Sequence, residues 1–406
     1  MAFELGPQDL EALLLGGAFF GSGGGGTITS ARHLAANFHA GDYYPSQRVR
    51  VVSVEEAGDG DTVMVAYMGA PEAINSTTYP IGPVAAARQV QARLAAQGRR
   101  LAYVVSPESG ALGFVVACLV AAKLGLAVVD ADGAGRAVPS LPMLTYAAAE
   151  ISPRPTFLVS QGELCVELDV TPRSGINGDP AHQQDVSVIV EQMTRPIVAA
   201  AQFGEFGGLA MWIMSPAELP AALPIRATLS RALQLGRALQ AGEIGSAAAM
   251  IDYLDKAFGI LARAISQPGE LVAAEVDTTG GFDLGKVHLQ AGARRYTVVY
   301  QNESLLAWDS ARPAPILLAP DSLAYFVEGP GQAVYSNGDL VLADGSLNPE
   351  VRQRTVTLLA WQADPALRTP GGLILDSFRQ LLASMGYLGP YVPVGELQRD
   401  RAEVGA

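Results

Sequence analysis

Histidine and cysteine are scarce in this chain, which has 4 of the former and 2 of the latter. No two histidines stand in an HxH or HExxH pattern, and Cys118 and Cys165 are far apart without a CxxC spacing. The spacings typical of zinc sites and disulfide frameworks are therefore missing. Both cysteines lie in apolar segments, and we expect them to be small buried side chains rather than nucleophiles.

Positive charge is also in short supply, because 27 Lys and Arg residues stand against 40 Asp and Glu residues, for a formal net charge of -13. Nucleic-acid binding needs clustered basic residues, so it is disfavoured. The N-terminus lacks a basic region followed by an apolar segment, which predicts a cytoplasmic protein. The longest apolar run, Ala111 to Val129, is broken by Lys123 and Gly125, and it predicts a helix followed by a buried strand rather than a membrane span.

Regular alternation of strands and helices occupies the first two-thirds of the chain. The expected helices are 7–20, 29–38, 83–96, 110–123, 184–203, 229–241 and 246–264, and the expected strands are 48–54, 62–68, 101–105 and 126–130. This order predicts an α/β fold, in which a layered domain contains a mostly parallel sheet. We assign this domain to residues 1–264 and expect 350–406 to complete it.

Short alternating runs separated by turn residues replace this pattern between Gly269 and Gly345. Gly280-Gly281 and Asn337-Gly338-Asp339 are typical of hairpin turns. We therefore predict a smaller all-β domain, either a barrel or a sandwich, over residues 265–349.

The residues most suggestive of chemistry follow a strand, in the segment Asp130-Ala131-Asp132-Gly133-Ala134-Gly135-Arg136-Ala137-Val138-Pro139. The carboxyl ends of parallel strands commonly meet ligands. Gly69 and Glu108 also follow strands, so Asp130, Asp132 and Glu108 are candidate acids, bases or metal ligands at one sheet edge. The alternatives are that the aspartates cap a helix, Arg136 is solvated, and Glu108 complements a helix dipole.

A second candidate is the run Ser22-Gly23-Gly24-Gly25-Gly26, between two expected helices. Its backbone N–H groups could hold an anion or a developing oxyanion, and Ser22 adds a hydroxyl. Neither a preceding strand nor a GxGxxG or P-loop pattern is present, so we expect no nucleotide cofactor. The alternative is a flexible connector.

His182 is the one histidine whose sequence context suggests a functional site, because it stands in a polar loop before a long expected helix. It could join Asp130 and Asp132 in binding a divalent metal ion, or act as a general base. A helix-entry histidine without a function is the other reading. The lack of a GxSxG motif disfavours acyl-enzyme chemistry and favours activated water.

Together these motifs resemble the S-methyl thiohydantoin desulfurase-like family, which is related in gene context to hydantoinases. The resemblance extends over nearly the whole chain. Its most specific part is the Asp-x-Asp-Gly-x-Gly-Arg-Ala-x-Pro string, preceded by the glycine run and by Met68-Gly69-Ala70-Pro71 and Glu108-Ser109-Gly110.

The resemblance implies attack of water on a ring carbon of a small cyclic amide, hydantoin or S-methyl thiohydantoin, with release of methanethiol in the last case. Asp130 or Asp132 would activate water, Glu108 would protonate the departing group, and the glycine run, Gly69 or Arg136 would hold the substrate. Two alternatives stay open: a non-catalytic small-metabolite binding protein, and a partner subunit of a hydantoinase-like enzyme. The oligomeric state is also left open, with a homo-oligomer as one alternative, and no membrane or nucleic-acid partner is expected.

Overall fold

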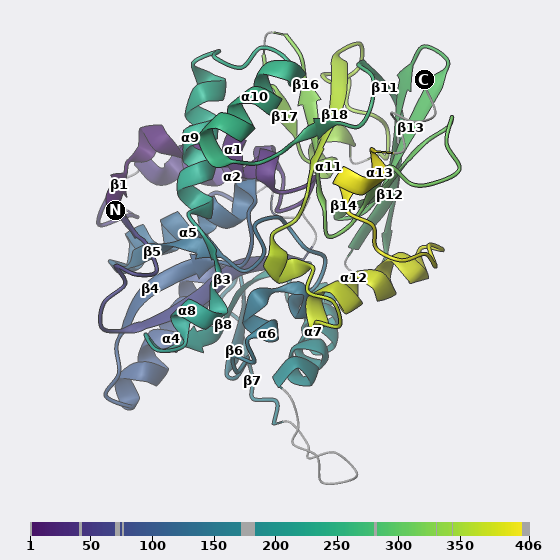
Figure 1. Ribbon diagram of the computed structural model, residues 1–406. Coiled ribbons are helices and arrows are strands. Elements are labelled where there is room, and N and C mark those ends of the chain that lie inside the picture. Colours follow the sequence, from purple (N-terminus) through teal and green to yellow (C-terminus); the bar gives the residue numbers. More distant parts are fainter. Residues whose placement is uncertain are drawn as a thin grey trace, which may run out of the picture.

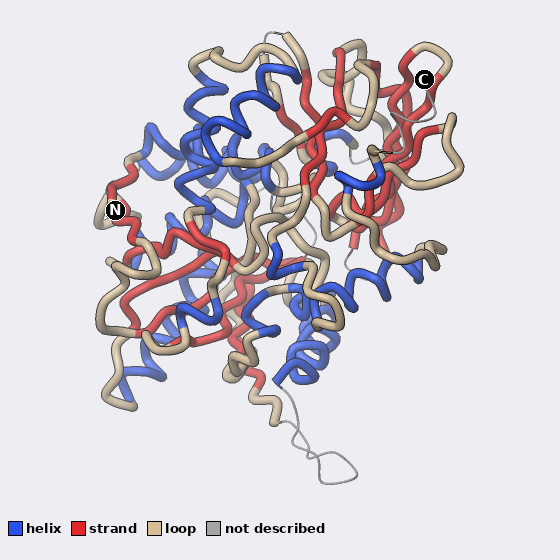
Figure 2. Tube along the Cα trace, in the orientation of Figure 1, coloured by secondary structure: helices blue, strands red, loops and turns tan. Residues whose placement is uncertain are grey.

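A computed structural model describes residues 2–39, 43–69, 74, 77–171, 183–279, 282–329, 331–342 and 344–399 of the chain. Two β-sheets organise these residues, and the helices gather mainly around the first sheet (Figures 1 and 2). The α/β class predicted from the sequence is confirmed, together with a separate β-rich region.

The first sheet has the strand order β1-β2-β5-β4-β3-β8-β6-β7, with β9 beside β5. Its strands are β1 (Phe3–Leu5), β2 (Val49–Val52), β3 (Asp61–Gly69), β4 (Leu101–Ser106), β5 (Ala127–Asp132), β6 (Thr156–Ser160), β7 (Cys165–Leu168), β8 (Phe206–Met214) and β9 (Ile225–Arg226). Neighbours β2, β5, β4 and β3 run parallel, whereas the other pairs are antiparallel. The sheet is thus mixed rather than mostly parallel, partly because β6 and β7 form a hairpin, whose short connection forces an antiparallel pair.

Alternate residues of this sheet enter two different cores, as the two-residue period of a strand requires. Val63 and Val65 face one core, whereas Met64 and Ala66 face the other. The first core is covered by α1 (Pro7–Phe20), α2 (Ile28–Ala36), α4 (Ile81–Ala96), α5 (Ala111–Leu124), α9 (Thr228–Gln240) and α10 (Ala247–Phe258). The second is covered by η2 (Leu141–Met143), α6 (Thr145–Ala148), α7 (Gln183–Ala199), α8 (Leu219–Ala222) and α12 (Leu373–Ser384).

The second sheet is antiparallel throughout and has the order β15-β14-β13-β12-β11-β18-β16-β17, with β10 beside β18. Its strands are β10 (Arg263–Ala264), β11 (Gly269–Thr279), β12 (Phe282–Ala291), β13 (Arg294–Gln301), β14 (Glu303–Asp309), β15 (Leu317–Leu318), β16 (Ser322–Val327), β17 (Val334–Tyr335) and β18 (Thr355–Trp361). No strand pair within the described residues joins β15 to β17, so this sheet does not close into the barrel that was one expectation.

The last part of the chain contacts both sheets. Strand β18 lies inside the second sheet, whereas α12 packs against η2 beside the first. Four short helices complete the described structure: η1 (Asn37–His39), which follows α2, α11 (Asn337–Leu340), η3 (Pro365–Leu367) and α13 (Val394–Leu397). The domain bounds 1–264, 265–349 and 350–406 stay a prediction.

The apolar run Ala111 to Val129 divides into α5 and β5, as expected. Within the described ranges, no helix has both the length and the apolar character needed to span a bilayer. Cys118 is buried in α5, and burial raises the pKa of its thiol to about 12. Cys165 is exposed on β7, so the expectation that both cysteines are buried was wrong for this one.

Candidate active site between the two sheets

A cavity of about 620 Å³ lies where the two sheets approach each other. From the first half of the chain, its walls are formed by the glycine run after α1, the ends of β3 and β4, the segment 138–141 and helix α7. From the second half, they are formed by strands β11, β12, β13 and β14 and by helix α11. This volume is within the range of small-molecule sites. It is the best candidate for chemistry among the cavities of the described residues.

The glycine run lines this cavity, as predicted, and it approaches the second sheet closely. Gly23, Gly25 and Gly26 adopt φ values of +83°, +72° and +83°, which favour glycine. A Cβ atom at Gly24 would collide with the carboxyl group of Glu303. Ser22 itself is buried outside the cavity lining, where its Oγ accepts a hydrogen bond from Leu323 N at 3.0 Å.

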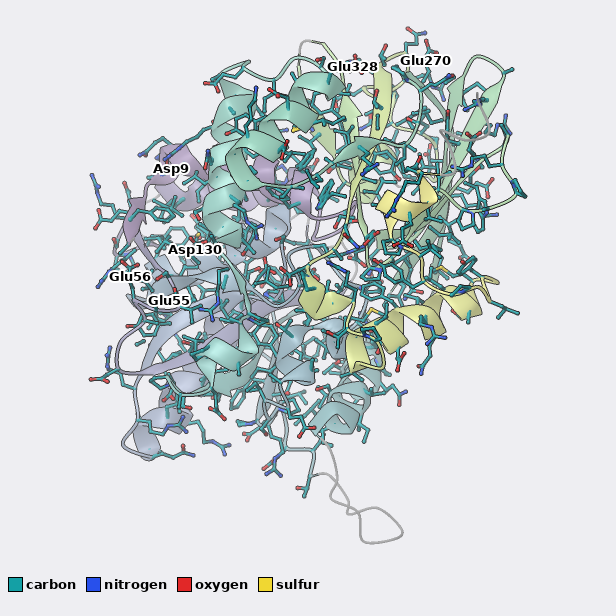
Figure 3. All side chains as sticks on the ribbon, in the orientation of Figure 1. Asp9, Glu55, Glu56, Asp130, Glu270 and Glu328 are labelled. Carbon is teal, nitrogen blue, oxygen red and sulfur yellow. The ribbon has the colours of Figure 1, made fainter. Side chains whose placement is uncertain are left out.

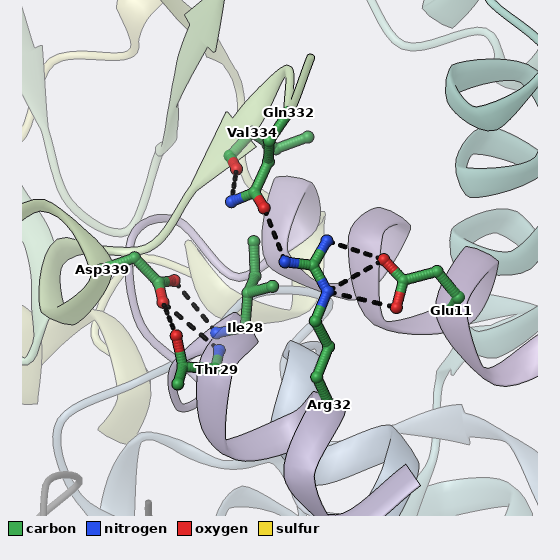
Figure 4. A network of polar contacts seen from close by, with 7 residues as sticks. All are labelled: Glu11, Ile28, Thr29, Arg32, Gln332, Val334 and Asp339. Atoms are coloured by element: carbon green, nitrogen blue, oxygen red, sulfur yellow. Dashed lines mark hydrogen bonds and ion pairs between the residues drawn. The ribbon is translucent and has the colours of Figure 1, made fainter. Parts of the chain in front are cut away.

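Helix α2 follows the glycine run and is fastened to the second half of the chain (Figure 4). Asp339 of α11 accepts hydrogen bonds from Ile28 N at 3.0 Å and Thr29 N at 3.4 Å, at the N-terminus of the helix. Arg32 forms an ion pair with Glu11 of α1 at 2.7 Å. The glycine run is thus held in place on both sides, which argues against a flexible connector.

Two carboxyl groups from different sheets line the cavity. Glu108 follows β4, and its Oε2 accepts a hydrogen bond from Val138 N at 2.7 Å. Glu303 begins β14 and is only 3% exposed, and its Oε2 has no hydrogen-bond partner among the described residues. A buried acceptor of this kind costs free energy unless a ligand or water satisfies it, so in a cavity wall it is a candidate ligand contact.

Both carboxyl groups hold their protons more tightly than usual. Burial raises the pKa of Glu303 to about 7, against the opposing attraction of Arg136 and a hydrogen bond from the Gly25 backbone. Burial, followed by the neighbouring charge of Glu303, raises the pKa of Glu108 well above its ordinary value. Because the negative charge of Glu303 further raises the pKa of Glu108, Glu303 ionises first and Glu108 keeps its proton.

Asp130 and Asp132 lie outside the cavity lining. Asp130 Oδ1 accepts hydrogen bonds from Leu229 N and Ser230 N, both at 3.0 Å, and its Oδ2 accepts one from Ser230 Oγ at 2.7 Å. Its side chain therefore caps the N-terminus of α9. Figure 3 labels Asp130 near the lower end of that helix. This is the capping arrangement that the sequence left open as an alternative for these aspartates.

Asp132 is fully buried and shapes the loop that follows it. Its Oδ1 accepts hydrogen bonds from Ala134 N at 2.8 Å and Gly135 N at 2.5 Å, and its Oδ2 accepts one from Ser109 Oγ at 2.7 Å. Burial is the main cause of its raised pKa. This loop then delivers residues 138–141 to the cavity wall.

Arg136 is 1% exposed, and its hydrogen bonds go to backbone carbonyls. Its Nε donates to Ala137 O, and its Nη atoms donate to the carbonyls of Ser304, Pro320 and Asp321, at distances from 2.7 to 2.9 Å. The solvated arginine considered as an alternative is therefore absent. The guanidinium joins the two sheets and acts on Glu303 through its charge, and it does not line the cavity.

Helix α7 adds residues that the sequence reasoning did not identify. Glu191 accepts hydrogen bonds from Leu141 N at 2.9 Å and from Arg195 Nε at 2.6 Å. Arg195 also stacks on the ring of Phe282 at 3.9 Å and donates to Pro139 O at 3.3 Å. These contacts hold the wall formed by residues 138–141 against the second sheet.

The cavity thus unites part of the predicted site. Gly23, Gly24, Gly25, Gly26, Gly69 and Glu108 line it, whereas Ser22, Asp130, Asp132 and Arg136 support it from outside. His182 lies outside the described residues, and within those residues no group of three His, Cys, Asp or Glu side chains could hold a metal ion.

The sequence reasoning did not identify Glu303. An acidic residue directly before an apolar run is common at the start of a strand, so it carries no signal of a site. Only the packing of the two sheets places it beside Glu108.

Two protein-family models match most of the chain. The S-Me-THD-like N-terminal domain matches residues 8–169, and the S-Me-THD-like C-terminal domain matches residues 184–394. The chain belongs to the S-Me-THD-like family. This confirms the resemblance drawn from the glycine run and the Asp130–Pro139 string, and the family name relates the chain to thiohydantoins.

A solved structure with the same fold also covers the chain. The X-ray crystal structure of a protein from Chromobacterium violaceum is 60% identical, with a TM-score of 0.89, and the match covers 97% of this chain and 100% of that one. No curated protein matches this member of the S-Me-THD-like family.

Proposed function

We propose that this protein hydrolyses a small S-methyl thiohydantoin-type ring in the cavity between its sheets. The observation that carries the proposal is the carboxyl pair: Glu303 has a buried Oε2 without a hydrogen-bond partner among the residues that the structure describes, and Glu108 lines the same cavity. Two carboxyl groups of unequal proton affinity provide a base and an acid in one site. The family name supports the choice of ring.

In the proposed reaction, ionised Glu303 accepts a proton from water as the water oxygen bonds to the ring carbon that carries the methylthio group. Protonated Glu108 donates its proton to the adjacent ring nitrogen. The tetrahedral intermediate then gives its hydroxyl proton to the Glu108 carboxylate as the C=O bond forms and the C–S bond breaks, and the proton held by Glu303 leaves with sulfur as methanethiol. The ring nitrogen retains the proton that it received from Glu108, so Glu303 ends ionised and Glu108 ends protonated, as both began.

The supporting residues have separate roles in this account. Arg136 favours the anion of Glu303, so that the base is ionised near neutral pH. Asp130 and Asp132, which the sequence offered as the water-activating acids, maintain the loop and helix that build the cavity. The glycine run forms the wall beside Glu303, and only glycine allows that approach.

The test is methanethiol release from an S-methyl thiohydantoin, measured with a thiol reagent. Glu303→Gln and Glu108→Gln should each lower kcat by about 100-fold or more, the usual contribution of a general acid or base. Glu270→Gln, on the exposed surface of β11, is the matched control and should keep wild-type activity. Wild-type rates in both cavity variants would overturn the proposal, and tight ring binding without release would favour a binding protein.

A further inference from the structure

A second cavity borders the loop that follows β5. Its volume is about 290 Å³, and Gly135 and Arg136 belong to its lining, whereas Val138 and Pro139 of the same loop line the candidate active site. The start of α9 forms another wall, and the segment 361–368, which contains η3, forms a third. This cavity therefore lies where the two halves of the chain meet, and the proposed function makes no use of it.

The lining of the second cavity is basic, although the chain as a whole has a formal net charge of -13. Arg136, Arg231 and Arg368 belong to it, and Asp364 is the only acidic residue among its described members. Arg136 contributes mainly charge, because its guanidinium already donates to backbone carbonyls. Arg231 stands in the first turn of α9, where the helix dipole disfavours a positive side chain, so a bound anion would offset this cost.

Arg231 and Arg368 keep most of their hydrogen-bond donors for a ligand. A guanidinium has five N–H groups. Arg231 uses two of them, because its Nε donates to Ala227 O at 3.2 Å and its Nη2 donates to Arg226 O at 3.1 Å. Arg368 uses one, because its Nε donates to Ala363 O at 3.0 Å. Neither arginine forms an ion pair with a described residue, and the backbone contacts hold both side chains in place.

An apolar wall stands in the same cavity. Ile260, Leu261 and Trp361 belong to its lining. Trp361 is fixed by stacking on Phe19 at 5.1 Å, whereas Leu261 is 68% exposed, so a ligand placed against it would remove apolar surface from water. The volume of about 290 Å³ is at the lower end for small-molecule sites, which limits the ligand to about one ring or a short chain.

From these walls we infer a second ligand site, which binds a small phosphate monoester. Arg231 and Arg368 contact the phosphoryl group, and the apolar ester group lies against Ile260 and Leu261. A phosphate monoester carries nearly two negative charges at neutral pH and three strong acceptor oxygens, which suits two guanidinium groups better than one carboxylate does. Because the ligand contacts both α9 and the segment that contains η3, its binding stabilises the junction between the halves. This inference does not depend on the proposed function.

Calorimetry on the full chain near neutral pH tests the site with three probes: phenyl phosphate, inorganic phosphate and benzoate. Phenyl phosphate should bind about tenfold or more tightly than inorganic phosphate, because its ring reaches the apolar wall. It should also bind about tenfold or more tightly than benzoate, because the phosphoryl group has more charge and more acceptors. No binding of phenyl phosphate at millimolar concentrations, or equal affinities within either comparison, would overturn the inference.

Four variants assign the affinity to the two walls. Arg231→Gln and Arg368→Gln should each weaken phenyl phosphate binding by about tenfold or more, since each removes a charge-assisted contact. Asp364→Asn removes the acidic residue of the lining and should strengthen binding by about threefold. Leu261→Ser changes an exposed side chain and should reduce the advantage of phenyl phosphate over inorganic phosphate.

Two arginine variants are the controls. Arg195→Gln is the matched one, because Arg195 is the basic residue in the described lining of the candidate active site, and Arg48→Gln lies on the exposed surface. Both should keep the dissociation constant of phenyl phosphate within about twofold of wild type, since neither residue lines the second cavity. Binding that is lost in Arg195→Gln but kept in Arg231→Gln and Arg368→Gln would place the probe in the candidate active site and overturn the inference.

Discussion

At the scale of single residues, the acids near the cavity differ in how fully the protein engages their oxygens. Glu303 lines the cavity, and its Oε2 has no hydrogen-bond partner in the described part of the chain, whereas Asp130 and Asp132 accept hydrogen bonds with both of their carboxylate oxygens. A carboxylate that is fully engaged by the protein is poorly placed to take a proton from water. The most distinctive acids in the sequence are therefore structural in this account.

Replacing Asp130 tests this separation. Asp130→Ala removes the acceptor for two backbone N–H groups and one hydroxyl at the start of α9, and it should lower the free energy of unfolding by about 1 kcal/mol or more. The kcat of methanethiol release by the folded variant should stay within about threefold of wild type, well short of the general-base effect. Ser246→Ala, which removes the side-chain cap of α10, is the control of similar kind. A kcat loss comparable to that of Glu303→Gln would return Asp130 to the chemistry.

At the scale of elements, local patterns in the sequence predict much of the secondary structure. The helix expected at Pro7–Phe20 is present with those bounds, and the strand expected at 126–130 corresponds to β5. The helix expected from Thr29 begins earlier, at Ile28, because Thr27 caps it by accepting from Ser30 N at 2.9 Å. Apolar periodicity and capping residues are local signals, so a single chain carries them.

The glycine run offers a prediction at this scale, because its backbone and Glu303 need the same space. Gly24→Ala should displace the Glu303 carboxyl group and lower kcat by about tenfold or more, since catalytic geometry tolerates little misplacement. Gly245→Ala is the control, because no atom lies within 4 Å of its added Cβ. Full activity of Gly24→Ala, with folding shown by circular dichroism, would contradict the close approach.

At the scale of the whole molecule, the candidate site depends on contacts that no local pattern encodes. Glu108 and Glu303 come from different sheets, and their pairing requires α2, Arg136 and Asp339 to fasten the halves together. The sequence correctly placed Glu108 and the glycine run near a site, because strand ends and glycine-rich loops carry general signals. It could not indicate Glu303 or the mixed character of the first sheet, since both result from long-range packing.

The prediction at the scale of the whole molecule concerns the replacement of Arg136. Arg136→Met keeps the length of the side chain but leaves four backbone carbonyls without their donor, so it should lower the free energy of unfolding by about 3 kcal/mol or more. Arg48→Met is the control, since Arg48 pairs with Glu4 on the exposed surface and should change stability by less than about 1 kcal/mol. Urea denaturation measures both variants, and equal stability of the two would show that Arg136 does not join the sheets.

The central claim is that Glu303 acts as the base and Glu108 as the acid, and the pH profile of kcat/KM for methanethiol release tests it most directly. The base must be ionised, so the rate should rise with pH until it levels off above the Glu303 pKa of about 7. The acid must be protonated, so the rate should fall again at a higher pH, where Glu108 loses its proton. The account predicts this bell shape for the wild type, with the rising limb lost in the residual activity of Glu303→Gln. A rising limb that persists unchanged in Glu303→Gln would contradict it.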